Sequence, residues 1–514
     1  MAGSRPRKAA PELPYEIWLA ILRYYELQPL EFGRAKLDSG FTARRSVLWT
    51  LCLVSPRLLD IARPLLYANI VLPLDGSNAS GRQCLRLLRA VSHNPQLGKL
   101  VSSLAVPLQP SLDVHWWDVT KGILQIQQAH DDYRLLFEEV KLPYIRANNT
   151  KDDQGAQQKL VALLIYLLPN LQRLLIHAPR NAGVAAIYLQ DAFGLLLQRQ
   201  GDSLVRSLEA LSISRTSSQD ASGHAPTTKS RSNDHRSEPF RSLELVQLQQ
   251  EAAYEQPGLI HIDPQLGHGL DGIVPILKAR SGRLKSLGLS DHCLMGVNKD
   301  PTAGTVLAQL EGLNLINLEH PSETTTILHG AERLETLSLD LTQRIPRLTG
   351  ELPSQLLTES NDDYNIAILE RKDTLRSLSF TAPYFQAQEL GYLLGPLERM
   401  TCLRDMINLQ FLRIEPHLLI DWLEVNTWPK FLDNMPRNLL KLALRFSRRE
   451  EEHCHRFARS GVGAALRSGE RWKAKMPRLQ AICLEPLTYG LRVAEELREA
   501  LHVDGITLTW VYEV

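Results

Sequence analysis

The segment LETLSLD, residues 334–340, carries the pattern that decides the fold of this chain. Its leucines Leu334, Leu337 and Leu339 follow the order apolar, two others, apolar, one other, apolar. Because side chains alternate along a β-strand, the last two leucines point to the same side of a short strand. The pattern begins again at Val101, Leu171, Leu208, Phe240, Leu284, Leu310, Leu375, Leu409, Leu439 and Leu479. This repetition predicts short parallel strands stacked side by side, since stacked units bury a core that no single unit can bury.

The segments between these strands predict how the chain returns from one strand to the next. Apolar stripes at helical spacing predict convex-side helices over residues 154–168, 270–279 and 491–501, and a helical insertion over residues 119–145. Residues 506–511 alternate in β fashion and predict a terminal strand. Residues 214–239 are rich in Ser, Asp and Arg with almost no apolar residue, which predicts a disordered loop.

The array resembles leucine-rich repeats, with two differences from the usual unit. The copies mostly lie farther apart than the usual ~20–29 residues, so the return paths are longer and uneven. The consensus asparagine is missing after the strands, where the clearest copies hold residues such as Pro179, His292 and Thr342. We therefore expect no side-chain ladder to support the turn after each strand.

The N-terminal segment, residues 13–67, predicts three short helices. Pro14 and Glu16 suit the first turn of the first helix. A second helix over about residues 43–54 follows a loop that includes residues 38–40. Ser55 is placed to cap a third helix with Pro56 at its first position, and we expect Pro64 to interrupt that helix. The apolar stripes of the first two helices are Ile17, Ile21 and Tyr25, and then Val47, Leu51 and Val54 with Leu48 alongside.

Three helices of this length bury too little apolar surface alone, so such a module docks on a partner or on its own chain. The segment resembles the F-box, in the form with Leu-Pro-x-Glu-Ile and a later Leu-x-Leu-Val-Ser-x-x-Leu. The residues that carry the resemblance are Leu13, Pro14, Glu16, Ile17, Ile21, Leu22, Leu51, Cys52, Leu53, Val54, Ser55, Arg57, Leu58, Ile61 and Ala62. F-boxes hand substrates to a cullin-RING ubiquitin ligase by binding its Skp-type adaptor, and irregular repeats of this kind resemble those of many fungal F-box proteins.

The resemblance implies an adaptor-binding surface on these helices. It would consist of Leu13, Pro14, Glu16, Ile17, Ile21, Leu22, Leu53, Val54, Leu58 and Ile61. A different interpretation is that the same helices are an N-terminal capping unit of the array.

The predicted fold is therefore α/β, with a three-helix F-box followed by an irregular leucine-rich-repeat solenoid. Its parallel strands would line the concave face and its helices the convex face. We divide the chain into a disordered tail (1–12), the helical module (13–72), a first repeat with the helical insertion (73–170) and the array (171–514), which contains the loop 214–239.

Composition argues against several classes of function. The chain has 514 residues, 44% hydrophobic and 22% charged, with a net charge of +1, so no global charge draws it to nucleic acid or an anionic membrane. The basic N-terminus is not followed by an apolar region typical of a signal peptide, and no run approaches the ~18 apolar residues of a membrane span. The six cysteines form no Cys-x-x-Cys, which favours reduced thiols in the cytoplasm or nucleus.

Motifs for catalysis or cofactor binding are weak. Gly267, Gly269 and Gly272 form a Gly-x-Gly-x-x-Gly, but Pro264 separates it from any strand, so a turn between repeats is the better interpretation. The cluster at residues 453–455, His-Cys-His, has no second cluster to complete a metal site, and a charged surface segment explains it better. The tandem tryptophans at 116–117 are interpreted as a packed edge. No hydrolase elbow, zinc-protease motif or P-loop is present in the sequence, so we expect no enzyme activity, cofactor or metal.

The residues between and just after the buried apolar pair of each strand should face the concave side. The early strands then present small hydroxyl residues such as Ser212, Ser214 and Ser290, and the strands from Leu409 onward present charges of both signs. We expect the target-binding residues to be His177, Asp340, Arg413, Glu415, Arg445 and Glu485, with the two arginines as the main anchors because a guanidinium can bind a carboxylate or phosphate through two hydrogen bonds.

The sequence thus predicts the substrate-recognition subunit of an SCF-type ubiquitin ligase, in which the F-box binds a Skp-type adaptor, and through it a cullin, while the repeats bind a target protein. The alternative is a leucine-rich-repeat interaction scaffold without a ubiquitin ligase role. A third, weaker alternative is an enzyme built on the solenoid.

Overall fold

The structure is a computed structural model of the 514-residue chain. It describes residues 13–30, 39–73, 78–107, 156–178, 243–250, 284–290, 301–316, 321–340, 362–381, 400–415, 418–419, 432–445, 474–485 and 505–510. The chain forms two compact units, the first containing residues 1–177 and 195–243 and the second containing residues 178–194 and 244–514. The predicted strand at Leu208, the insertion 119–145, the loop 214–239 and the helices over 270–279 and 491–501 lie outside the described residues, as do the glycine motif at 267–272, Trp116 and the cluster at 453–455.

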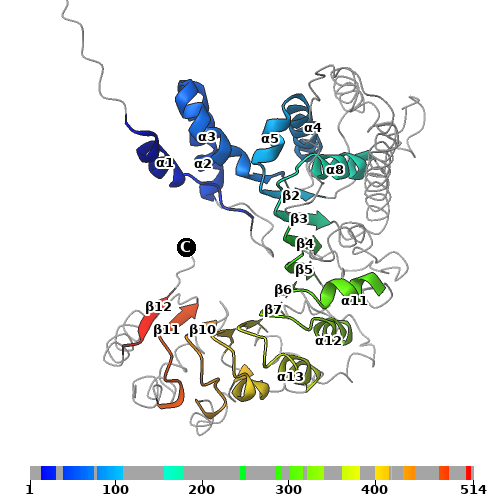
Figure 1. The fold of residues 1–514 in the computed structure, drawn as a ribbon, viewed down its shortest axis with the longest axis vertical. Helices are drawn as coiled ribbons and strands as arrows, with labels where there is room; N and C mark the ends of the chain where they lie inside the picture. Colours follow the sequence, from blue (N-terminus) through cyan, green and yellow to red (C-terminus); the bar gives the residue numbers. More distant parts are fainter. Residues whose placement is uncertain are drawn as a thin grey trace, which may run out of the picture. The chain divides into compact units, whose positions relative to one another are not determined.

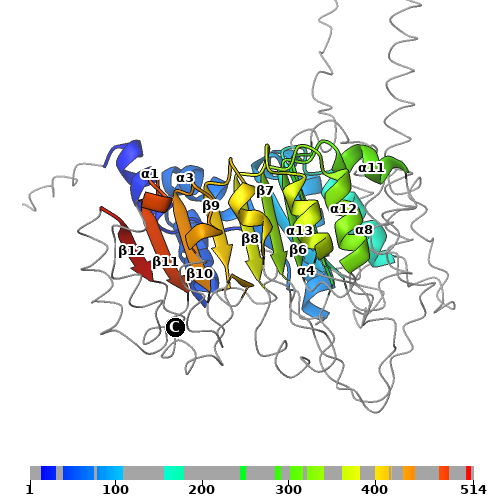
Figure 2. The same cartoon turned by 90° about the horizontal axis from the view of Figure 1, so that it is seen from below.

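Both units are α/β, and the strands in each are parallel and paired in the order of the sequence (Figure 1). The first unit contains β1 (Asn69–Val71), β2 (Ser103–Pro107) and β3 (Arg173–Ala178). The second contains β4 (Leu245–Gln250), β5 (Ser286–Ser290), β6 (Gly312–Ile316), β7 (Thr336–Asp340), β8 (Ser377–Thr381), β9 (Phe411–Ile414), β10 (Lys441–Arg445), β11 (Ala481–Glu485) and β12 (Thr507–Trp510). Figure 2 shows the later strands of the second unit side by side in this order. This arrangement is compatible with a solenoid, and β12 confirms the predicted terminal strand.

The strand pairing confirms the register predicted from the repeated motif at most copies. In the second unit the second motif positions form one row across the sheet, each at most 3% exposed: Leu287, Leu313, Leu337, Leu378, Leu412, Leu442 and Ile482. Leu104 and Leu174 pair in the same way in the first unit. A continuous apolar row therefore runs through each stack of strands.

The copy predicted to begin at Phe240 is wrong by three residues. Val246 pairs with Leu287, and both Leu243 and Val246 are fully buried, whereas Leu245 is only half-buried. The motif therefore begins at Leu243. Apolar residues at 240, 243, 245, 246 and 248 fit the pattern in two registers, and only pairing with the neighbouring strand selects one.

Helices cover the side of the strands to which the motif residues point. The first unit has α4 (Asn78–His93), α5 (Pro95–Leu100) and α8 (Ala156–Tyr166), of which α8 confirms the helix predicted at 154–168. The second has α11 (Pro301–Leu307), α12 (Pro321–Gly330), α13 (Asp362–Leu369) and the short 3-10 helix η6 (Cys402–Asp405), with α11 to α13 on the outer side of the curved strands (Figure 1). Tyr364 of α13 packs edge-to-face on Phe380 of β8, with ring centroids 6.1 Å apart, which places the motif side of β8 against α13.

A hydrogen-bond pattern is repeated where the chain enters eight of the described strands, β3 and β5 to β11. The backbone N–H groups of Glu335 and Thr336 both donate to the carbonyl of Glu311, and those of Arg376 and Ser377 both donate to the carbonyl of Glu335. The same double donation recurs at 172–173, 285–286, 311–312, 410–411, 440–441 and 480–481. Neighbouring copies are thus hydrogen-bonded to each other at the residues just before their strands pair.

Three asparagines reinforce this entry. Asn170, Asn408 and Asn438 each stand directly before the first leucine of a copy, and each donates from Nδ2 to a backbone carbonyl of the preceding copy at 2.6–2.8 Å. We expected no side-chain support in the turn after each strand, and the side-chain contact of this chain lies before the strand instead.

Candidate protein-binding surfaces

The N-terminal helices are α1 (Tyr15–Arg23), α2 (Ser39–Val54) and α3 (Pro56–Ala68). Pro14 is the N-cap of α1 rather than its first residue. The helix α2 starts at Ser39, earlier than predicted, so Ser39 and Gly40 belong to a helix and not to a loop. The packing of Phe41 explains this extension, because its side chain is 6% exposed in the common core and such burial stabilises the first turn of α2.

The helix α3 starts as the sequence predicts but ends later. The Ser55 hydroxyl accepts a hydrogen bond from the backbone N–H of Leu58 at 3.2 Å, and Pro56 occupies the first turn. The predicted interruption at Pro64 is wrong, because α3 continues to Ala68. Ile61 and Leu66 are buried on either side of the proline, and their packing offsets the hydrogen bond that proline cannot make.

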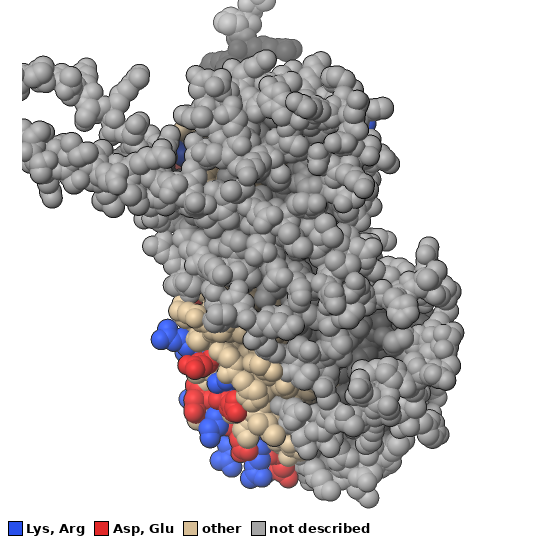
Figure 3. Space-filling model, turned by 90° about the vertical axis from the view of Figure 1, so that its right-hand side faces the viewer, with Lys and Arg blue, Asp and Glu red and all other residues tan. Residues whose placement is uncertain are grey.

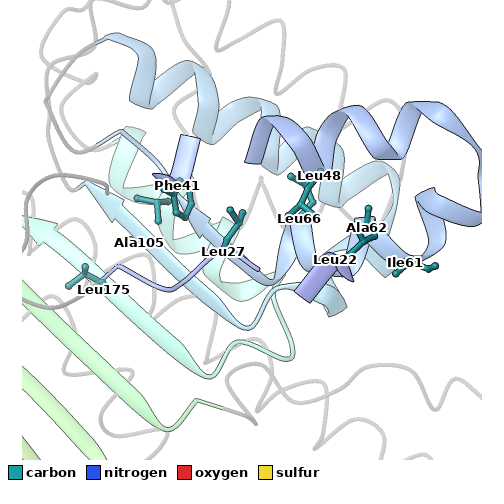
Figure 4. Close-up of a cluster of buried hydrophobic side chains, with 10 residues drawn as sticks. Leu22, Leu27, Phe41, Leu48, Ile61, Ala62, Leu66, Ala105 and Leu175 are labelled. Carbon is teal, nitrogen blue, oxygen red and sulfur yellow. The ribbon is translucent and has the colours of Figure 1, made fainter. Parts of the chain in front are cut away.

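A common core joins α1, α2 and α3 (Figure 4). It contains Leu22, Leu27, Phe41, Leu48, Ile61, Ala62, Leu66, Val71, Ala105 and Leu175. In α2 the buried side chains are Phe41 and Leu48, whereas Val47 and Val54 are 37% and 63% exposed, so the face predicted from Val47, Leu51 and Val54 is not the buried one. Leu22 and Ile61, two of the residues expected on the adaptor surface, are each 1% exposed and contribute to this core.

The same core includes the concave side of β1, β2 and β3. Val71, Ala105 and Leu175 form one register row opposite the motif side, and each is at most 4% exposed. Figure 4 shows Phe41 and Leu27 beside the strand that carries Ala105. The side chain of Asn69 donates to the carbonyl of Leu27, which fixes the chain after α1 to β1. The helices therefore cover the first strands on the side away from α4 and α8.

His177 lies on the same side of its strand. It is 2% exposed at the end of β3, on the same side as Leu175, so it lies in the interior and not on the accessible surface expected for a target-binding residue. The sequence placed His177 on the correct face of its strand but could not show that the N-terminal helices cover that face.

Apolar side chains of the N-terminal helices remain outside this core. Leu13, Ile17 and Ile21 recur along the start and one stripe of α1 and are 42–47% exposed, and Leu53 and Val54 at the end of α2 are 72% and 63% exposed. Pro14 and Glu16 are also exposed, and Leu58 is half-buried. The guanidinium of Arg57 donates to the carbonyl of Leu13 at 2.7 Å, which brings the start of α1 to the corner between α2 and α3. We name the exposed residues Leu13, Ile17, Ile21, Leu53 and Val54 the N-terminal apolar surface.

The concave face of the second unit changes character along the array. From β5 to β8 its residues are small or neutral, except for the half-buried Asp340: Ser286, Gly288, Gly312, Asn314, Thr336, Ser338, Ser377 and Ser379. From β9 to β11 the face carries Phe411, Arg413, Lys441, Arg445 and Glu485. The change follows the sequence prediction that charges concentrate in the C-terminal strands.

An ion pair spans three of these strands. Nε and a terminal nitrogen of Arg413 on β9 lie 2.7 Å and 2.6 Å from one carboxylate oxygen of Glu485 on β11. Glu485 is the register partner of Arg445, two residues beyond the row of Arg413, Ala443 and Cys483, so Arg413 crosses β10 diagonally, and the short Ala443 side chain beside it leaves room for the crossing. The other carboxylate oxygen lies 3.7 Å from the sulfur of Cys483, whose thiol donates to it. Glu415, also expected on the surface, is 3% exposed and lies at a turn directly after β9, where its backbone carbonyl accepts from the N–H of Leu418.

The helix side of the second unit carries mixed charge. Figure 3 shows acidic and basic side chains interspersed over the described part of that face. Arg371 donates to the carbonyls of Leu328 and His329 at the end of α12, and His329 lies 2.7 Å from a Glu370 carboxylate oxygen. These contacts join α12 to the turn after α13. The charged side chains of Arg371 and Glu370 and the imidazole of His329 therefore have a structural role.

The described residues contain no group of three or more side chains that could hold a metal ion. None of the described helices is long and apolar enough to cross a membrane. Burial raises the pKa of the Cys84 and Cys402 thiols to about 12, so neither has the low pKa of a reactive cysteine.

Comparison with known proteins assigns no family to the chain. No model of a known protein family matches its sequence, and no curated protein matches it either.

Proposed function

We propose that this chain is the substrate-recognition subunit of an SCF-type cullin-RING ubiquitin ligase. Helices α1 to α3 bind a Skp-type adaptor, the strand array binds the target protein, and the chain itself performs no chemistry. The proposal combines the resemblance of residues 13–62 to an F-box with the exposure of the N-terminal apolar surface.

That exposure is the observation that carries the proposal. The helices already have a core of their own, and yet Leu13, Ile17, Ile21, Leu53 and Val54 are 42–72% exposed. Apolar side chains from separate helices that remain exposed beside a complete core are typical of a protein-binding surface. Leu22 and Ile61 support this surface from within, because both are buried beneath it.

Co-purification with the adaptor tests the proposal. The full-length chain, co-expressed with a Skp-type adaptor, should retain it through gel filtration. Burying one leucine or isoleucine is worth roughly 1.5–3 kcal/mol, so Leu53→Ala and Ile17→Ala should each weaken binding about tenfold or more.

Ile407→Ala is the matched control, because Ile407 is 54% exposed but belongs to the second unit. It should leave adaptor binding unchanged, and none of the three variants should lower the melting temperature. Failure of the unmodified chain to retain the adaptor, or full binding by both Leu53→Ala and Ile17→Ala, contradicts the proposal.

A second candidate is an interaction scaffold without a ubiquitin ligase role. It is favoured by the direct passage from α3 to β1, and by a helical core that contains Val71, Ala105 and Leu175 of the strands. Those features are expected of an N-terminal cap for a stack of strands. A folded chain that binds a protein partner but never retains the adaptor would support this function instead.

A further inference from the structure

The concave face of the second unit has two chemically different parts. The described concave residues of β5 to β8 are mostly small and neutral, and the larger Ile316 among them is only 8% exposed, so they offer little contact area and no cation. The face of β9 to β11 contains the large side chains Phe411 and Arg413 and the cations Lys441 and Arg445. Aromatic and arginine side chains are the residues that most often dominate binding at protein interfaces.

The contact between Arg413 and Glu485 shows that this face can bind a carboxylate. Two nitrogens of Arg413 lie 2.7 Å and 2.6 Å from one oxygen of Glu485. Arg413 reaches Glu485 diagonally across β10, over two strand spacings of together about 10 Å and to the next row on the same face, past the short side chain of its register partner Ala443. The chain thus holds one of its own carboxylates in a position that a carboxylate of a partner can take.

The charges that solvent can reach on this face are mostly positive. Lys441 is exposed and lies over the Phe411 ring at 5.6 Å from its centroid, Arg445 is half-buried, and the Arg413 side chain is 37% exposed. The Glu485 side chain is only 19% exposed, and Glu415 is 3% exposed. Arg445 is the register partner of Glu485, so the side chains of these two residues leave neighbouring strands on the same face. A partner therefore meets three cations against one partly covered carboxylate.

We propose that the concave face of β9 to β11 binds an acidic peptide segment of the target protein. One carboxylate of that segment binds Arg445, another competes with Glu485 for Arg413, and the Lys441–Phe411 pair contacts the segment at the other end of β10. The inference rests on the part of the proposed function that gives the strand array a target, and does not require the adaptor.

Fluorescence anisotropy on the full-length chain tests this binding. The probes are a fluorescein-labelled decapeptide of alternating glutamate and glycine, and its counterpart with glutamine in place of glutamate. The glutamate peptide should bind more tightly, and its affinity should fall as salt is added, because exposed charges are screened. Arg445→Ala should weaken its binding about fivefold, the upper range for one partly exposed ion pair.

Glu485→Gln distinguishes competition between Glu485 and the peptide from a merely structural role of Glu485. Glutamine keeps the shape and one oxygen acceptor but removes the competing charge, so the glutamate peptide should bind more tightly to this variant than to the unmodified chain. Lys372→Ala is the control, since Lys372 is an exposed cation after α13, and it should leave peptide binding unchanged.

Four results would overturn the inference: equal binding of the two peptides, no effect of Arg445→Ala, weaker binding by Glu485→Gln, or binding of an oligothymidylate as tight as that of the glutamate peptide. The last result would indicate a nucleic-acid surface. Adaptor retention is measured on the same variants. Lost adaptor with intact peptide binding contradicts the ligase function alone, and lost peptide binding with retained adaptor contradicts this inference alone.

Discussion

Single asparagines before the strands have a defined structural role in this chain. The Nδ2 donors of Asn170, Asn408 and Asn438 reach the carbonyls of Lys99, Asp373 and Ile407, each in the copy before. Each of these asparagines precedes the first leucine of its copy, so the signal was present in the sequence. It was missed because the leucine-rich-repeat consensus places its asparagine after the strand.

Replacing Asn438 by Ala or by Asp should destabilise the chain. Both changes remove the Nδ2 donor, and a hydrogen bond of this kind contributes about 0.5–1.5 kcal/mol. Aspartate should be the more harmful of the two, because its carboxylate would face the Ile407 carbonyl. Urea unfolding measures the effect, and an Asn438→Asp chain as stable as the unmodified one would show that the contact contributes nothing.

At the scale of elements, packing decides where a helix begins and ends in this chain. The sequence located α1, α2 and α3 from their apolar spacing, but it ended α3 at Pro64 and began α2 too late. Both errors have one cause. Phe41 in α2 and Leu66 in α3 are buried, and their packing outweighs the local sequence signals for the start of α2 and the end of α3. Contacts distant in sequence supply that burial, and no local pattern records them.

Pro64→Ala should stabilise the first unit. Pro64 is exposed within α3, and alanine restores a backbone N–H for the carbonyl one turn earlier without disturbing the core. A proline inside a helix costs about 3 kcal/mol, so a gain of about 1–3 kcal/mol in the free energy of unfolding is expected. Thermal and urea unfolding measure it. A loss of stability would mean that the proline is required for the geometry of α3.

At the scale of the whole molecule, the sequence predicted the strands well and the surfaces only in part. The motif copies from Leu284 to Leu479 coincide with strands because period-two alternation is a local property of the backbone. Exposure is not local. His177 was expected at the surface and is 2% exposed, whereas Arg413 was expected to be available and is bound to Glu485 two strands away. Both outcomes depend on residues from distant parts of the chain.

The thiols of the chain should differ in reactivity with their burial. Cys84 and Cys402 are 3% and 4% exposed, and burial raises the pKa of both to about 12, whereas Cys52 is only half-buried with a pKa raised by its burial. Iodoacetamide should therefore modify Cys52 before Cys84 and Cys402 in the folded chain, as measured by mass spectrometry of the peptides. In urea the three should react alike, and early modification of Cys84 in the folded chain would contradict the burial.

The raised pKa values of Cys84 and Cys402 make the free energy of unfolding depend on pH. In the unfolded chain the thiols of Cys84 and Cys402 ionise near the ordinary value of 9.0, but in the folded chain not until about 12. Their contribution to stability is therefore fully present below pH 9 and is lost as the pH rises from about 9 to about 12.

The asparagine contacts at the strand entries also bear on how such an array can change in evolution. Their acceptors are main-chain carbonyls of a lysine, an aspartate and an isoleucine, so the contact does not depend on the identity of the accepting residue. Each copy that carries the asparagine supplies the hydrogen-bond donor itself. Any neighbouring copy with the same backbone path supplies the acceptor. Units can then be duplicated, lost or exchanged without a compensating substitution in the unit before them. Such a history would leave an array with uneven spacing between its copies.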